Sequence, residues 1–476
     1  MRYSGFSLAA VAASAFLIIG LSSAVEAIAS CNPATCVHPA CVCPSLKPPK
    51  GLDPKLVPQF VTLTFDDAVQ GPTVPVADAL MKPHVNPNRC PIKATWFAQT
   101  IYSDYSLIQQ WYANGNEVAD HTMNHVGTPP PEEIIGNRKS INAFSGIPFA
   151  NMNGFRAPFL NYSDNTFQIL GQEKFLYDSS TAAVPTDAYW PYTLDNGLAN
   201  DCWNGICEKA ISIPGMWEIP MHAIMDSELA TAIPHSMDVQ LDGSADVVGG
   251  WLRTNFDRHY NGDRAPFGIF LHPVHVGNAV QLYNDFFESI LLKPDVWFVT
   301  NQQLLEWMKN PVPASQLADQ PYMKCTLPMV GKEICNGMDD TKSGAIDKGV
   351  LETCNFVAGP WSTCYGCPKT MPSVADPVPE RVTAAGQVGF RTPVPVTCAM
   401  EWWDPVAAQC LCQSSNCTFQ DTAVPVNKAT PGTGSGSSST TGSKPSSHSG
   451  AVQTYGAWAA GMGGLAAIAA GLVQLL

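Results

Sequence analysis

Short apolar runs alternate with helix-like segments through the middle of the chain. Eight runs have the length and apolar character of buried strands: 60–65, 93–98, 117–119, 154–156, 175–177, 217–219, 267–271 and 296–300. Helix-like segments at 106–113, 131–144 and 165–172 follow three of them, and residues 103–105 and 163–164 offer N-caps. This alternation between residues 56 and 313 predicts an α/β fold, a distorted (β/α) barrel.

The segments on either side of the barrel have the composition of processing signals and linkers. Residues 1–27 combine Arg2 with an apolar run and small residues, the pattern of a secretory signal peptide. Residues 428–450 form a stalk rich in Ser, Thr, Gly and Pro, and residues 451–476 carry no charge. This end predicts a glycosylphosphatidylinositol (GPI) attachment signal whose tail is removed, with attachment within 446–450. A C-terminal membrane helix is the alternative, but such helices usually end in Lys or Arg, which this tail lacks.

Composition limits the partners and the compartment. The formal net charge is −14, and only 14% of the residues are charged. Nucleic acids and anionic membrane surfaces attract basic patches, so neither is expected as a partner, and membrane contact is expected only through the lipid anchor. Sixteen cysteines indicate disulfides and an oxidising compartment. We therefore expect a secreted protein at the outer face of the plasma membrane or in the cell wall.

The cysteines fall into three groups along the chain. Four lie in the N-terminal segment 28–55, and nine lie in 314–427, a density typical of a small disulfide-rich module. In the barrel, Cys202 and Cys207 can close a local loop, which leaves Cys90 to pair outward with Cys325, the nearest later cysteine. The pairing of the other twelve stays open.

Charged and metal-ligating side chains stand at the ends of five of the predicted strands. They are Asp66 and Asp67, His121 with His125 four residues later, Arg156, Asp178 and His272. The carboxyl ends of barrel strands meet on one face, where barrel enzymes build their active sites. Side chains of a solvated surface would be scattered along the strands, so the pattern predicts a single site.

The residue types in this set indicate metal-assisted hydrolysis. Two histidines at i and i+4 with one carboxylate can bind Zn²⁺ and leave a position open, although an isolated pair of this kind is more often structural. Adjacent aspartates at a strand end cannot both point inward in a regular pleat, so one would bind metal and the other would act as base. Arg156 would keep the base ionised. His272 would be the acid, held protonated by a carboxylate such as Asp178.

These motifs resemble the polysaccharide deacetylases, carbohydrate esterase family 4 with its NodB-homology domain. The first three motifs of the family correspond to TFDD at 64–67, HTMNH at 121–125 and RAPF at 156–159. Segments such as TFDDAV, IKATWF, FLYDS, WPYT and NFDRHY are most similar to the insect-type chitin deacetylases, and the resemblance covers roughly residues 56–325. Two motifs depart from the common pattern: Asp178 is followed by SSTAA without the usual Trp, and the last motif reads FLH at 270–272.

The resemblance implies a role for each site residue. Asp66 would be the base, oriented by Arg156, and His272 would be the acid, tuned by Asp178. Asp67, His121 and His125 would bind Zn²⁺ or another divalent metal such as Co²⁺. The backbone N–H of Phe159 would share the oxyanion with the metal.

The expected reaction is hydrolytic N-deacetylation of N-acetylglucosamine polymers, most simply chitin to chitosan and acetate. The alternatives are a deacetylase of another acetylated polysaccharide and a non-catalytic protein that binds chitin or the wall. Because every expected catalytic position is filled, the sequence favours the enzyme.

Overall fold

The computed structural model describes residues 31–201, 211–325 and 351–382, with the short stretches 393–395, 397, 403–404 and 409–410. Its central sheet contains all eight predicted strands, and every ladder between two of these eight is parallel. The strands are β1 Gln59–Ala68, β2 Thr95–Gln99, β3 Glu117–Asp120, β4 Gly154–Phe155, β5 Tyr177–Asp178, β8 Trp217–Glu218, β12 Phe267–Leu271 and β13 Val296–Phe298. The predicted α/β fold is confirmed.

The barrel is distorted because its ring of strands stays open. Both β12 and β13 pair with β1, at different levels along that long strand. At the other end of the sheet, β8 pairs with the antiparallel strand β7 Tyr192–Thr193. Within the described residues no ladder joins β8 to β12. The sheet is therefore a curled half-barrel.

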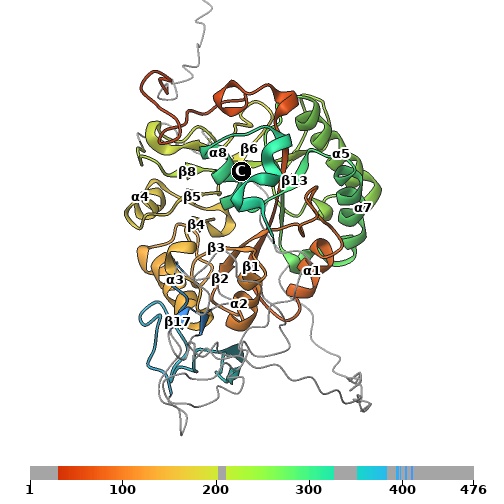
Figure 1. Ribbon diagram of the computed structural model, residues 1–476. Helices are drawn as coiled ribbons and strands as arrows, with labels where there is room; N and C mark the ends of the chain where they lie inside the picture. The colour runs from red at the N-terminus through yellow and green to blue at the C-terminus, as the bar shows by residue number, and fades with distance from the viewer. Residues whose placement is uncertain are drawn as a thin grey trace, which may run out of the picture. The chain divides into compact units, whose positions relative to one another are not determined.

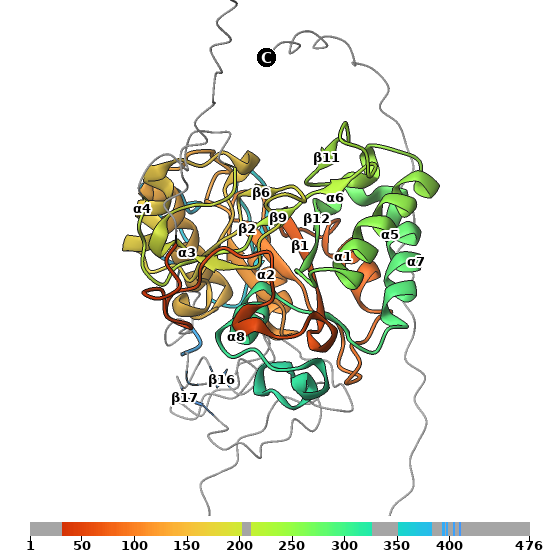
Figure 2. The ribbon, with the colours of Figure 1, turned by 90° about the horizontal axis from the view of Figure 1, so that it is seen from above.

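Helices surround the strands on the outside (Figure 1). They are α1 Val74–Met81, α2 Tyr105–Ala113, α3 Pro131–Ser145, α4 Asp164–Gln172, α5 Ala245–Asn261, α6 Pro273–Val276, α7 Val280–Leu291 and α8 Asn301–Lys309. In Figure 2, β1, β2 and β12 lie between α3 and α4 on one side and α5 and α7 on the other. The three helices expected from the sequence are present, and two begin at the expected caps: the side chain of Asp104 caps α2, and Ser163 caps α4.

The alternation of side chains along β1 decides which residues reach the site. Val61, Leu63 and Phe65 pack in the same hydrophobic cluster as residues of α2, α5 and α7, whereas Phe60 packs in a second cluster with Phe97. By the period of two, Thr64 and Asp66 share the face of Phe60, inside the barrel. Both faces of this strand are buried, as expected for a parallel sheet covered by helices.

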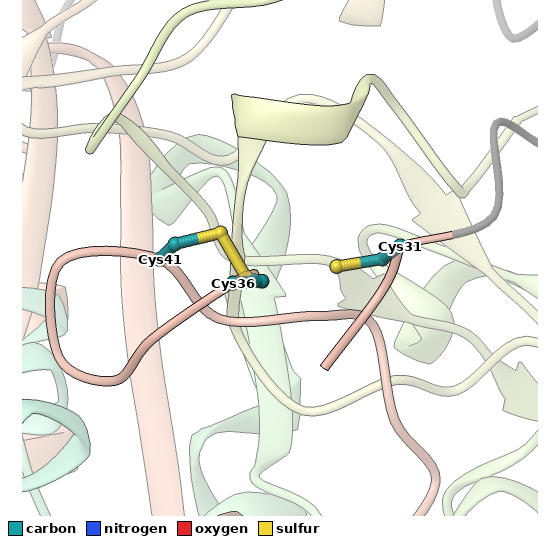
Figure 3. Close-up of side chains that lie close together, drawn as sticks. All are labelled: Cys31, Cys36 and Cys41. Atoms are coloured by element: carbon teal, nitrogen blue, oxygen red, sulfur yellow. A yellow bond between two sulfur atoms is a disulfide. The ribbon is translucent and has the colours of Figure 1, made fainter. Parts of the chain in front are cut away.

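Disulfides close the N-terminal segment on itself and join the barrel to Cys325. Cys31 pairs with Cys43 and Cys36 pairs with Cys41, and Figure 3 shows the second bond beside Cys31. The predicted Cys90–Cys325 disulfide is confirmed. The predicted Cys202–Cys207 pair lies outside the described residues.

The described part of the C-terminal Cys-rich segment shares the core of the barrel. It contains the hairpin β14 Glu352–Cys354 and β15 Trp361–Thr363, closed by the Cys354–Cys367 disulfide. The ring centroid of Trp361 lies 4.6 Å from that of Tyr105 on α2 and 5.4 Å from that of Phe144 on α3. This hairpin therefore packs as part of the barrel. Among the residues that the structure describes, no helix combines the length and apolarity needed to cross a bilayer.

Candidate active site

The predicted site residues gather at the carboxyl ends of β1, β3, β4 and β12. Asp66 and Asp67 are near the end of β1, His121 follows β3, Arg156 follows β4 and His272 follows β12. Side-chain contacts between these residues join all four strand ends into one site. Four of the five predicted strand ends therefore meet in one site, and the fifth, at Asp178, is not joined to it by these contacts.

Asp67 turns toward the histidines because the backbone leaves the regular pleat. Its φ is +80°, a conformation that L-residues rarely adopt. Its Oδ1 lies 3.1 Å from Nε2 of His125 and 3.6 Å from Nε2 of His121. Burial alone would raise the pKa of Asp67, but the nearby imidazoles of His125, His121 and His272 hold it below its ordinary value. The strained backbone thus lets two adjacent aspartates serve the same site.

These three side chains fit a divalent cation. One ligand atom from each lies within 4.8 Å of the others. His121 is buried, and its Nδ1 donates to the carbonyl oxygen of Arg156 at 2.8 Å, so its Nε2 carries the lone pair. Burial lowers the pKa of His121 to about 4, which keeps the ring neutral. Oδ1 of Asp67 and Nε2 of His121 are buried without a hydrogen-bond partner in the described part of the chain, as expected of atoms that bind a metal.

Two further groups could hold a metal by geometry alone. Cys31, Cys36 and Cys41 lie close together, but all three form disulfides and offer no thiolate (Figure 3). Asp238 lies close to His272 and His275, and its carboxylate is engaged by both imidazoles. Of the three groups found among the described residues, the one around Asp67 contains two buried ligand atoms without a hydrogen-bond partner, Oδ1 of Asp67 and Nε2 of His121.

Asp66 is held by Arg156 inside the barrel. Both side chains are almost fully buried, and Nη1 of Arg156 donates to Oδ1 of Asp66 at 2.7 Å and to Oγ1 of Thr64 at 2.8 Å. The other guanidinium donors bind Ser179, through its carbonyl oxygen at 2.7 Å and its hydroxyl at 3.1 Å. The guanidinium also lies over the ring of Phe97. Four hydrogen bonds therefore fix the cation that balances the buried carboxylate.

His272 is paired with Asp238, which corrects the expectation that Asp178 is its partner. Nδ1 of His272 lies 2.5 Å from Oδ2 of Asp238, whose Oδ1 accepts the backbone N–H of His272 at 2.8 Å. Burial would lower the pKa of His272, but the hydrogen bond to Asp238 and the charges of Asp66, Asp238 and Asp67 raise it to about 9. Nε2 of His272 lies 3.8 Å from Oδ2 of Asp67. The ring is an imidazolium at neutral pH, with its free N–H beside the candidate metal ligands.

Asp178 is engaged elsewhere. Its two oxygens accept the N–H and the hydroxyl of Ser180, both at 2.8 Å. Sequence reasoning missed Asp238, because this residue lies in an irregular segment 34 residues before His272 and not at a strand end.

Phe159 lies against the candidate metal site. Its φ is +59°, its ring centroid is 4.4 Å from that of His125, and its side chain is 73% exposed. The N–H groups of the next two residues donate to Ala157 and Pro158 within the same turn. For the N–H of Phe159 itself the described residues supply no backbone acceptor. The donor is available to a ligand in the exposed site.

Comparison with known proteins identifies the family of this chain. The family profile described as polysaccharide deacetylase matches residues 54–176. Chitin deacetylase 8 of Bombyx mori is 32% identical over 374 residues, covering 73% of this chain and 93% of that protein. Chitin deacetylase 1 of the same species is 30% identical over 380 residues, covering 73% and 68%. The structure of the chitin deacetylase from Colletotrichum lindemuthianum matches with a TM-score of 0.31 and 16% identity, over 52% of this chain and 90% of that one. By its similarity to these Bombyx mori proteins over most of its length, the chain belongs to the polysaccharide deacetylase family and is a hydrolase.

Proposed function

We propose that this protein hydrolyses the N-acetyl groups of N-acetylglucosamine polymers, chitin first, in a metal-dependent reaction. The proposal rests on one observation: candidate metal ligands, a base and an acid lie together at the carboxyl ends of the strands. The Asp67–His121–His125 ligand set lies beside a buried carboxylate, Asp66, and an imidazolium, His272. Amide hydrolysis needs a base and an acid with opposite protonation states, and the two groups meet that requirement.

Asp66 is suited to remove a proton from the attacking water. Arg156 fixes the carboxylate by a hydrogen bond of 2.7 Å, so the carboxylate is already oriented before the reaction begins. A divalent cation held by Asp67, His121 and His125, Zn²⁺ or alternatively Co²⁺, would supply Lewis acidity that polarises the amide carbonyl and acidifies water.

His272 is suited to protonate the departing amine. Its Nδ1–H is directed at Asp238, so the proton available for transfer is the one on Nε2. The N–H of Phe159 would donate to the carbonyl oxygen as negative charge develops there. The exposed Phe159 ring beside His125 offers an apolar surface next to the reacting group.

The substrate class is supported by the two Bombyx mori relatives, which are chitin deacetylases by name. The test compares acetate release from chitin oligomers, peptidoglycan fragments and acetylated xylan. We expect release from chitin oligomers that a chelator stops and added Zn²⁺ restores. Release from acetylated xylan alone, or release that resists chelation, would contradict the proposal.

We also propose that the protein acts outside the cell, held at the surface by a GPI anchor. Four described disulfides support an oxidising compartment. The polar stalk and uncharged tail, which lie outside the described residues, support the anchor. Phosphatidylinositol-specific phospholipase should release the protein from membranes, and an intact tail on the mature protein, seen by mass spectrometry, would exclude this anchor.

A further inference from the structure

A buried pair of acidic side chains has no place in the proposed mechanism. Asp178 ends β5 and Glu218 ends β8, and the two residues stand opposite each other in the parallel ladder. Both are fully buried. Two ionised carboxylates at neighbouring buried positions would repel each other strongly, and a proton shared between them would remove that repulsion.

The two carboxyls differ in the number of hydrogen bonds that they accept. Asp178 accepts two hydrogen bonds, from the N–H and the hydroxyl of Ser180. Glu218 accepts one at Oε1, from the hydroxyl of Thr181 at 2.7 Å, while its Oε2 is buried and faces no donor in the described part of the chain. An oxygen in that position is satisfied as an O–H that donates to the neighbouring carboxylate. Burial raises the pKa of Glu218 well above its ordinary value, and the charge of Asp178 adds to the effect.

The pair is connected to the segment that carries the catalytic groups. The hydroxyl of Ser180 donates to Asp178 and accepts the backbone N–H of Ala157 at 2.8 Å. Ala157 follows Arg156, which is itself held by the carbonyl and hydroxyl of Ser179. Two residues further along is Phe159, which has a positive φ of +59° and whose N–H is the proposed oxyanion donor. Hydrogen bonds therefore connect Asp178 to the loop that carries the guanidinium of Arg156 and the proposed oxyanion donor, the N–H of Phe159.

We propose that Asp178 and Glu218 share one proton and act as positioning residues for the loop from Arg156 to Phe159. The carboxylate of Asp178 orients Ser180, and Ser180 fixes the loop through the N–H of Ala157. Protonated Glu218 holds Asp178 in place without adding a second negative charge. The inference rests on the proposed deacetylation, because its kinetic test needs that activity.

Three variants test the pair by acetate release from chitin oligomers at equal metal content. Asp178→Asn cannot accept both hydrogen bonds from Ser180, and we expect kcat to fall on the order of 100-fold with KM little changed. Glu218→Ala should cause a similar loss. Glu218→Gln, whose amide can donate to Asp178 as the protonated acid does, should keep kcat within about threefold of the wild type. Full activity in Asp178→Asn, or equal losses in Glu218→Gln and Glu218→Ala, would overturn the proposal.

The pH profile separates positioning from tuning of the acid. A positioning role lowers kcat in Asp178→Asn and leaves the basic limb of kcat/KM where it is in the wild type. A shift of that limb to lower pH would mean that Asp178 acts on His272, and the proposal would be wrong. Ser180→Ala keeps both carboxyls, and its kcat should fall about tenfold or more with metal content unchanged.

A spectroscopic measurement tests the shared proton without activity. Infrared difference spectra between the wild type and Glu218→Gln should show loss of the C=O stretch of a protonated carboxyl at neutral pH. Absence of that band in the wild type would overturn the assignment. If the wild type releases no acetate, the proposed function fails, and the infrared band still decides whether the acid pair shares a proton.

Discussion

Replacing Asp238 by Asn should move the basic limb of the pH profile to lower pH. In the proposed mechanism the protonated form of His272 is the active form, so kcat/KM should fall as the pH rises through the pKa of this residue. The pKa is raised from 6.5 to about 9, a difference that corresponds to about 3 kcal/mol in favour of the imidazolium. Asp238 provides the hydrogen bond and one of three carboxylate charges behind this shift. Removing the charge of Asp238 should shift the basic limb of the kcat/KM profile to lower pH by at least about one unit.

The substitution Asp238→Asn should leave the backbone conformation unchanged. Asp238 has φ +51° and ψ 39°, a left-handed conformation that Asn also tolerates well. An amide oxygen can still accept the backbone N–H of His272, so the loop should keep its place. The assay is kcat/KM for a chitin oligomer over the alkaline range, with wild type and variant at the same metal content. Since a cation near Asp67 would lower the pKa in both proteins, the limbs are compared with each other.

The matched control is Asp178→Asn, which removes a buried carboxylate that makes no hydrogen bond to His272. Its basic limb should stay in place. A limb that does not move in Asp238→Asn would refute the assignment of Asp238 as the partner that holds His272 protonated. It would also mean that the acid of the reaction is another group.

Three further predictions concern the ligand set, the buried cation and the long-range disulfide. His125→Ala should lose bound Zn²⁺ and acetate release together, and unchanged stoichiometry and affinity for Zn²⁺ would show that the ligand assignment is wrong. Arg156→Lys keeps the charge but cannot reproduce four hydrogen bonds in fixed directions, so kcat should fall on the order of 100-fold while metal content stays constant. The double variant Cys90→Ala/Cys325→Ala opens a link that spans 235 residues, and calorimetry should show a loss of stability of about 2–4 kcal/mol with the rate at low temperature unchanged. An unchanged Tm in the double variant would contradict the last of these.

The strands could be predicted because burial on both faces makes them short, apolar and easily separated from the polar segments around them. Helix α5 was not predicted, since Gly249 and Gly250 lower its intrinsic propensity. It is stabilised by tertiary packing, with Val248, Leu252 and Phe256 in the core of the barrel. Local sequence does not report that kind of stabilisation.

Some features of the candidate active site could likewise be predicted from the sequence, and others could not. Residues at strand ends could be placed together from the sequence, because parallel strands bring their carboxyl ends to one face. The positive φ of Asp67 and the contact between Asp238 and His272 could not, since both depend on loops whose course is set by the rest of the fold. Likewise, Trp361 belongs to a Cys-rich segment that the sequence indicated to have little core, yet it is 4% exposed among aromatic residues of α2 and α3.

The most direct test of the account compares acetate release from chitin oligomers by the wild type and by Asp66→Asn, both reconstituted with Zn²⁺ to measured, equal content. The carboxylate of Asp66 is assigned as the base, and Asn keeps its size and its hydrogen bond from Arg156 without its charge. We expect turnover in the wild type and a loss of at least about 100-fold in the variant at the same metal content. Equal rates in the two proteins, or no acetate from the metal-loaded wild type, would contradict it.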